Sequence, residues 1–191
     1  MADLSEDTEV KVATDGDWYQ PFHIIHTDNC EAAQHFVDSF YPTLGNPKTR
    51  ATIPSFYIKP TLVSPQRPDI NLNGNVMTEP SEVQKIFEAQ IPKAHYEVQS
   101  FDCHLVNPNY NVGLDDAALA PSKDGKKMSI VVMVSGSVKY YKSSDEEEAR
   151  VEARGFTETF VLVPNQEAQN PKAAKGLKRW LIQSQNFRLV L

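Results

Sequence analysis

The second half of the chain carries a hydrophobic alternation with a period of two, and this pattern restricts the fold more than any other feature. Four segments show it, at 96–106, 128–141, 155–163 and 180–191. Alternation over segments this long predicts half-buried β-strands. Polar loops are expected between them, at 107–127, 142–154 and 164–179. Strands that follow one another across plain loops predict an antiparallel meander.

The first half of the chain has helical periodicity instead. Apolar residues recur at helical spacing in 28–41, and a shorter helix is predicted at 47–55. A third helix is predicted at 79–91, where Pro80 fits the first turn and Pro92 stops the segment. We therefore expect an α+β fold with the helices on one side of a curved antiparallel sheet.

Two short extended segments are predicted between the second and third helices. YIKPTLV at 57–63 indicates a strand, and INLNGNVM at 70–77 has apolar residues on both sides of Asn73-Gly74. An Asn-Gly pair in that setting is typical of a β-hairpin turn.

Length and charge predict a single domain at 18–191 behind an acidic tail at 1–17. The chain has 191 residues, and the tail holds six acids and one lysine, which is −5 of the net charge of −6. The polar, aperiodic tail is expected to be disordered. The nearly neutral remainder is unsuited to binding nucleic acid by itself, because that affinity comes mainly from lysine and arginine. We expect the protein to act through a partner or a pocket.

Residue composition excludes several other classes. The two cysteines, Cys30 and Cys103, rule out a disulfide scaffold and suit a reducing compartment. No apolar run approaches the roughly 20 residues that a membrane span needs, so no membrane contact is predicted.

One face of the predicted sheet is nearly free of charge. Residues of 128–141 that point away from Ile130 and Val132 are apolar or small, and the later strands add threonines and amides. The resulting candidate partner interface comprises Val131, Met133, Ser135, Ser137, Thr157, Thr159, Val161, Gln183 and Gln185. A solvated sheet face ordinarily carries charges, whereas a protein interface is depleted of them. The alternative is that helices cover both faces, but the chain has few helices for that.

Short motifs in order along 28–191 resemble the nuclear transport factor 2-like family, and within it the small subunits of messenger RNA export receptors. The matching residues are Phe36-Val37, Phe40-Tyr41, Leu72-Asn73-Gly74-Asn75, Phe101-Asp102-Cys103, Gly136-Ser137-Val138-Lys139-Tyr140 and Phe187-Arg188. The loops are longer than in the compact animal members and resemble the fungal branch. The resemblance implies a cone of three helices from the N-terminal half, packed on a strongly bent, mostly antiparallel sheet.

The resemblance also implies a function. By this resemblance, the protein would be a non-catalytic subunit without cofactor or metal. It would heterodimerise through its sheet face with the large export subunit. The pair would bind nuclear pore Phe-Gly repeats and export ribonucleoprotein, in the nucleus and at the pore, and shuttle to the cytoplasm. Arg188 would pair with an aspartate of the large subunit. A pair with an internal acid such as Asp102 and simple exposure are the alternatives.

Two other functions stay open at this point. Asp102 and His104 lie two apart on one strand and share a face, so an isomerase or dehydratase of the same fold is an alternative, with Asp102 in the cone. The many phenylalanines and tyrosines favour a filled cone instead. A homodimeric import carrier for Ran is the other alternative.

Two weaker candidates complete the sequence predictions. His23, His26, Asp28 and Cys30 could be drawn as a metal site, but a second ligand pair is missing from the sequence around them, so no metal is predicted. The basic loop at 172–179 could make a weak contact with RNA.

Overall fold

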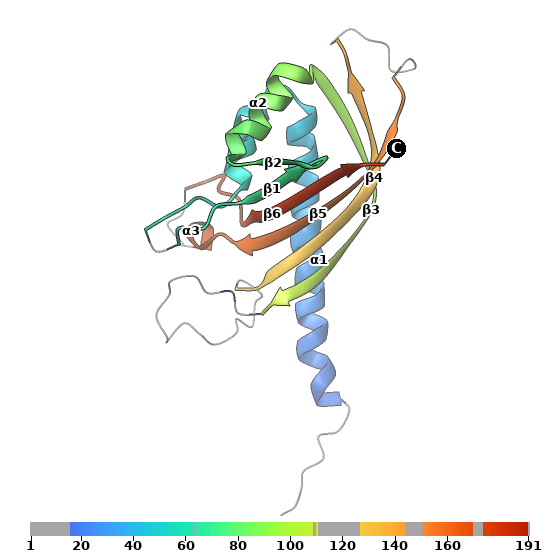
Figure 1. Ribbon diagram of the computed structural model, residues 1–191. Helices are drawn as coiled ribbons and strands as arrows, with labels where there is room; N and C mark the ends of the chain where they lie inside the picture. Colours follow the sequence, from blue (N-terminus) through green and yellow to red (C-terminus); the bar gives the residue numbers. More distant parts are fainter. Residues whose placement is uncertain are drawn as a thin grey trace, which may run out of the picture.

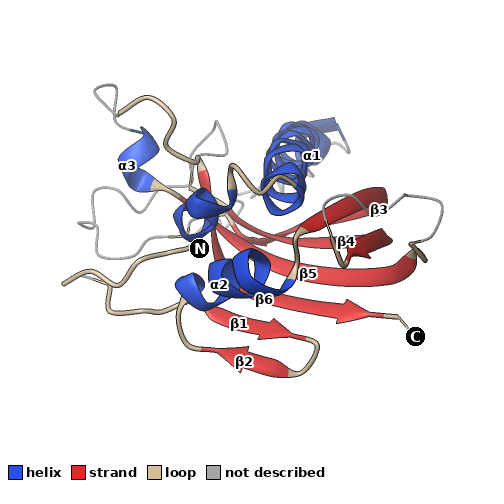
Figure 2. Ribbon diagram, turned by 90° about the horizontal axis from the view of Figure 1, so that it is seen from above, coloured by secondary structure: helices blue, strands red, loops and turns tan. Residues whose placement is uncertain are grey.

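The computed structural model describes residues 16–62, 64–108, 110, 127–143, 151–169 and 174–190. Its helices are α1 (Gly16–Gly45), the 3₁₀ helix η1 (Arg50–Phe56), α2 (Pro80–Gln90) and α3 (Gln166–Gln169). Its strands are β1 (Asp69–Leu72), β2 (Asn75–Met77), β3 (Lys93–Asn107), β4 (Ser129–Tyr141), β5 (Arg154–Pro164) and β6 (Trp180–Leu189). The helices α1 and α2 lie on the same side of the curved sheet (Figures 1 and 2).

The six strands form one sheet in the order β2-β1-β6-β5-β4-β3. Every neighbouring pair is antiparallel except β1 and β6, which run parallel. The four long strands follow one another as a meander, as their alternation predicted. The turn between β1 and β2 has positive φ at Asn73 and Gly74, which confirms the predicted hairpin.

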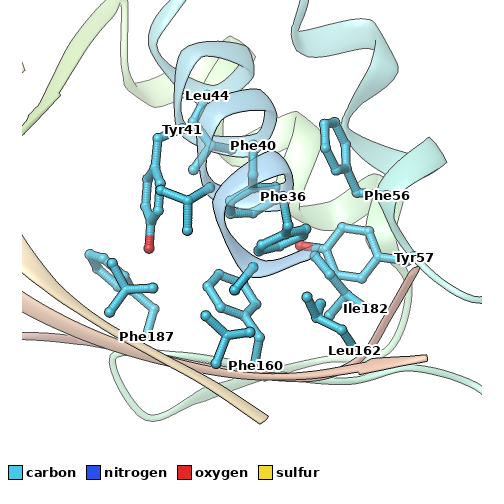
Figure 3. Packing of buried hydrophobic residues seen from close by; sticks show 14 of the residues in the cluster. Phe36, Phe40, Tyr41, Leu44, Phe56, Tyr57, Phe160, Leu162, Ile182 and Phe187 are labelled. Atoms are coloured by element: carbon cyan, nitrogen blue, oxygen red, sulfur yellow. The ribbon is translucent and has the colours of Figure 1, made fainter. Parts of the chain in front are cut away.

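Aromatic side chains fill the space between α1 and the sheet (Figure 3). The rings of Phe36 and Phe160 meet edge to face, with centroids 4.8 Å apart, and Phe40 contacts Phe56 and Phe160 at 5.3 Å each. Such pairs contribute beyond their buried area. This part of the predicted cone is packed solid, in agreement with the aromatic composition.

A buried arginine joins the ends of two helices. The guanidinium of Arg50 donates to the carbonyl of Leu44 in the last turn of α1 and to the carbonyls of Phe87 and Ile91 at the end of α2. Carbonyls at a helix end lack intrahelical donors, and a cation there also suits the helix dipole. Arg50 therefore fixes α1, η1 and α2 to one another on the helix-covered side of the sheet.

The sheet bends where β3 meets a glycine of β4. The register of the two strands shifts between Val98 and Ser100, and a Cβ added at Gly136 would lie 2.2 Å from the carbonyl oxygen of Glu97. Only glycine permits this approach of the two backbones. The Gly-Ser motif seen in the sequence thus has a structural role at the bend.

Three predicted elements differ from the structure. The first helix begins at Gly16 rather than at 28, so the last two residues of the predicted tail are helical, and residues 1–15 lie outside the described part. The segment around 47–55 is a 3₁₀ helix that ends at Phe56. The described residues of 57–63 make one isolated bridge, Tyr57 to Ile182, and no strand, because Pro60 removes a backbone donor there.

The described residues contain neither a membrane-spanning helix nor a cluster of metal ligands. No helix among them is long and apolar enough to span a bilayer. No group of three or more histidine, cysteine, aspartate or glutamate side chains among them could hold a metal ion. The side chains of His23, His26 and Asp28 lie outside the described part.

Candidate functional site

The sheet face that points away from α1 and α2, here called the outer face, carries most of the candidate interface residues. Cross-strand pairing aligns them in rows. One row runs Asp102, Met133, Thr159, Asn186, and the next runs Ser100, Ser135, Thr157, Arg188. Residues that pair directly across strands contact one another on one face. The rows therefore make one continuous surface from β3 to β6.

The centre of the outer face is apolar or uncharged. Met133 is 43% exposed, and Val131 and Val161 pair beside it and are half-buried. The inward residues of the same strand, Ile130 and Val132, are fully buried, which confirms the predicted division of the strand into two faces. Methionine is enriched and charge is depleted at the centres of protein interfaces, so this surface remains the candidate partner interface.

Gln183 and Gln185 lie on opposite faces of the sheet, which corrects the prediction that both belong to the interface. The register of β5 and β6 shifts between Val161 and Leu162, so that Ser184 pairs with Val161 and Ile182 with Leu162. The extra residue is a β-bulge, and it moves every later side chain to the other face. Gln183 is half-buried among the outer residues, whereas Gln185 is buried among the inner ones.

Arg188 lies on the outer face after the bulge, beside the β1–β2 turn. Its backbone pairs with Thr157, and its Nη1 atom would be 3.2 Å from a Cβ added at Gly74. Asn73 fixes this corner, since its backbone amide donates to the carbonyl of Phe187 and its side chain accepts from the amide of Leu189. The side chain of Arg188 is exposed and makes no ion pair with any described residue.

Asp102 lies on the outer face, so the alternative that places it in the cone of an enzyme is wrong. Its carboxylate is 67% exposed and contacts His104 at 3.0 Å. Both residues are on β3, which forms one of the two edges of the sheet, and the inward residue between them is the buried Cys103. The alternation of the strand puts Asp102 outside because Cys103 packs against α1, where its sulfur lies 3.5 Å from that of Cys30.

Among the described residues, the carboxylate that lies inside the cone is Glu158, which the sequence predictions missed. It is 2% exposed; Tyr41 donates to its Oε2 atom at 2.7 Å, and Gln185 donates to its Oε1 atom at 2.6 Å. Tyr57 in turn donates to the Gln185 carbonyl oxygen. Burial raises the pKa of Glu158 to about 7, although both donors lower it in part. The sequence does contain a sign of its burial. Glu158 alternates in step with Phe156 and Phe160, so it points to the same inward face of the strand.

The described part of the basic loop is only partly free to bind a partner. Lys178 lies 4.1 Å from the centroid of the Phe56 ring, and burial lowers its pKa. Lys175 and Arg179 are exposed, and residue 172 lies outside the described part. The side chain of Asn165 donates to the carbonyl of Lys178, which ties the loop to the end of β5.

The comparisons with known proteins agree with this architecture. Neither a protein-family model nor a curated protein matches the sequence. The chain is similar to a solved structure of a Sac3N peptide bound to Mex67:Mtr2, with 27% identity and a TM-score of 0.71 over 85% of this chain and 99% of the other. It is similar in the same way to a Chaetomium thermophilum Mex67 NTF2-like domain complexed with Mtr2, at 26% identity, a TM-score of 0.71 and coverage of 85% and 99%.

Enzymes with this architecture match less well. A putative dehydratase from the NTF2-like family of Streptomyces avermitilis is 12% identical, with a TM-score of 0.58 over 86% of this chain and 97% of the other. That likeness concerns the fold alone. The chain thus has the nuclear transport factor 2-like fold, with helices on a bent, mostly antiparallel six-stranded sheet. Within that class it is structurally matched to Mtr2 chains that were solved in complex with Mex67.

Proposed function

We propose that this protein is the non-catalytic small subunit of a nuclear messenger RNA export receptor and that it binds the large subunit through its outer face. The observation that carries the proposal is the surface around Met133, which is exposed, continuous across four strands and uncharged at its centre. The likeness to Mtr2 chains from complexes with Mex67 supports the same partner.

Arg188 is the specific contact in this proposal. Arginine is always charged, and its planar guanidinium suits a carboxylate in two parallel hydrogen bonds. Because Arg188 is exposed and unpaired among the described residues, it can take a carboxylate from the partner. Its neighbour Thr157 and the β1–β2 turn would limit its side-chain freedom, which lowers the entropy lost on binding.

Co-expression with a Mex67 NTF2-like domain, followed by light scattering, tests the proposal. We expect a 1:1 heterodimer, and we expect Arg188→Glu to weaken it at least a hundredfold, since it puts like charges together. Arg179→Glu is the matched control, because it reverses an exposed arginine outside the outer face. A monomer that ignores the domain would contradict the proposal, and a stable homodimer would favour the carrier for Ran.

The remaining parts of the proposal concern the assembled heterodimer. It would bind Phe-Gly repeats of nuclear pore proteins at the pore, since a phenylalanine in a shallow apolar site makes weak and rapidly reversible contacts. It would carry export ribonucleoprotein and shuttle between nucleus and cytoplasm. Lys175 and Arg179 are the exposed basic residues of the described loop, so a double alanine variant should reduce any RNA affinity at low salt.

A further inference from the structure

A cavity of about 240 Å³ lies on the helix-covered side of the sheet, between α2, the β1–β2 hairpin and the strands β3 to β6. Its floor is formed by buried residues, among them Phe87 and Glu158. Its rim includes the exposed residues Asn73, Asn75 and Gln90. The cavity is therefore open to solvent at one end and lined by the interior of the protein at the other.

The floor presents a carboxylate for which the described residues supply no cation. Each oxygen of Glu158 accepts one hydrogen bond, from Tyr41 and from Gln185, and both donors are neutral. The other buried charge, Arg50, donates to backbone carbonyls and makes no ion pair with a described residue. Because buried charges in proteins are ordinarily paired, the cavity has the local character of a cation site.

The walls around the carboxylate are aromatic and aliphatic. Phe87, Phe187, Tyr96 and Tyr140 line the cavity together with Ile86. Aromatic faces attract a cation through their quadrupole, most strongly where water is excluded. The guanidinium of Arg50 already lies over the Phe87 ring, 5.6 Å from its centroid, so Phe187 and the two tyrosines are the aromatic walls left for a ligand. The hydroxyls of Tyr96 and Tyr140 lie 3.0 Å apart, so one donates to the other and one proton is left for a further acceptor.

We propose that this cavity binds a small organic amine, with its ammonium group against the carboxylate of Glu158 and its apolar body between α2 and Phe187. The volume limits the ligand, since pockets for drug-sized molecules measure roughly 300–1,000 Å³. A molecule about the size of one aromatic side chain fits this space. The site is separate from the outer face and does not depend on the proposed heterodimer.

Proton binding by Glu158 sets the pH dependence of this site. Burial raises its pKa to about 7, so the carboxylate is mostly protonated at pH 6 and mostly ionised at pH 8. The hydroxyls that face it, those of Tyr41, Tyr57, Tyr96 and Tyr140, stay neutral in this range because burial raises their pKa values. Arg50 lies close enough to Tyr96 to favour its ionised form, and it keeps its own charge across this range. Amine binding should therefore strengthen about tenfold from pH 6 to pH 8.

The test uses the full chain, with 2-phenylethylamine as the probe and 2-phenylethanol as its neutral isostere. In an NMR titration at pH 8, the amine should shift backbone amides of Phe87, Gln185 and Phe187, and the alcohol should bind at least tenfold more weakly. Equal affinity of the two compounds would overturn the assignment of a cation site. Amide shifts confined to other regions, or none, would overturn the cavity as a site.

Variants test the role of the carboxylate and the role of the cavity separately. Glu158→Gln should abolish the preference for the amine and its pH dependence, while Asp102→Asn, which neutralises an exposed carboxylate, should change neither. If Glu158→Gln does not fold, Ile86→Trp fills the cavity from α2 with the carboxylate intact and should abolish binding of both probes. Binding that survives Ile86→Trp or a preference that survives Glu158→Gln would contradict the proposal.

Discussion

The hydroxyl of Tyr41 donates a hydrogen bond of 2.7 Å to the carboxylate of Glu158, which links α1 to the middle of β5 through the interior of the protein. Both residues are buried, and the bond spans 117 positions of the sequence. The contact forms only in the folded protein, because most of the other elements lie between this helix and this strand in the sequence.

Tyr41→Phe should destabilise the protein by about 1–3 kcal/mol, because a buried carboxylate oxygen loses its donor. Loss of the hydroxyl should also raise the pKa of Glu158 further, since Tyr41 favours the ionised form. Urea unfolding at pH 7 measures the change. Tyr110→Phe is the control, because its hydroxyl makes only a 3.5 Å contact with the exposed Gln66 and a 3.3 Å contact with Gln183; an equal loss in both variants would contradict the expectation.

The stability of the protein should fall as pH rises from about 5 to 8. In the folded state the pKa of Glu158 is raised to about 7 from the usual 4.5, so the folded state binds the proton more tightly than the unfolded chain does. The resulting stability is complete below the unfolded value and is lost as pH rises through about 7, by about 2–3 kcal/mol over this range.

The measurement for this second prediction is the free energy of unfolding at pH 5 and pH 8, for the wild-type chain and for Glu158→Gln. The variant has no proton to lose at this position. Between pH 5 and pH 8 its free energy of unfolding should therefore fall less than that of the wild-type chain, by about 2–3 kcal/mol. Parallel pH profiles for the two proteins would show that Glu158 does not titrate in this range.

Met133→Asp should break the proposed heterodimer without unfolding the subunit. The new carboxylate would be buried at the centre of the interface without a partner, and we expect at least a hundredfold loss of affinity. Val76→Asp is a suitable control, because Val76 is 69% exposed on β2, away from that centre. Calorimetric titration with the large-subunit domain compares the two, and unchanged binding by Met133→Asp would place the interface elsewhere.

Gly136→Ala should cost about 1–3 kcal/mol of stability, because the new methyl group would overlap the backbone of Glu97 and must push β3 away. Gly155→Ala on the next strand is the matched control, since its added Cβ would lie at an ordinary 3.4 Å from Val190. Thermal unfolding of both variants gives the comparison. A neutral Gly136→Ala would mean that the bend of the sheet relaxes freely.

The elements of the fold were largely predictable, because alternation and helical spacing are local properties of the sequence. The four long strands, the hairpin at Asn73-Gly74 and α2 appear where these patterns put them. The 3₁₀ form of η1 and the missing strand after Tyr57 were not predictable, since they depend on how Arg50 and the following prolines pack against neighbours.

The candidate interface was less predictable from the sequence than the elements of the fold. The sequence predicted a face without charge on β4 and β5, and the structure has it. Its continuation on β6 was predicted only in part, because the bulge near Gln183 reverses the side of Gln185. A shift of one residue cannot be recognised from a strand by itself, because it is defined only relative to the strand that pairs with it.

By itself, then, the sequence determined the class of fold, the order of its elements and the uncharged character of one sheet face, since each of these follows from local periodicity. Only the tertiary structure decided which carboxylate lies in the interior and which lies outside. Asp102 and Glu158 are both acids within alternating strands, and they differ in what the face of the strand that carries each of them packs against. The face of Asp102 meets the solvent, and the face of Glu158 meets α1 with its tyrosine.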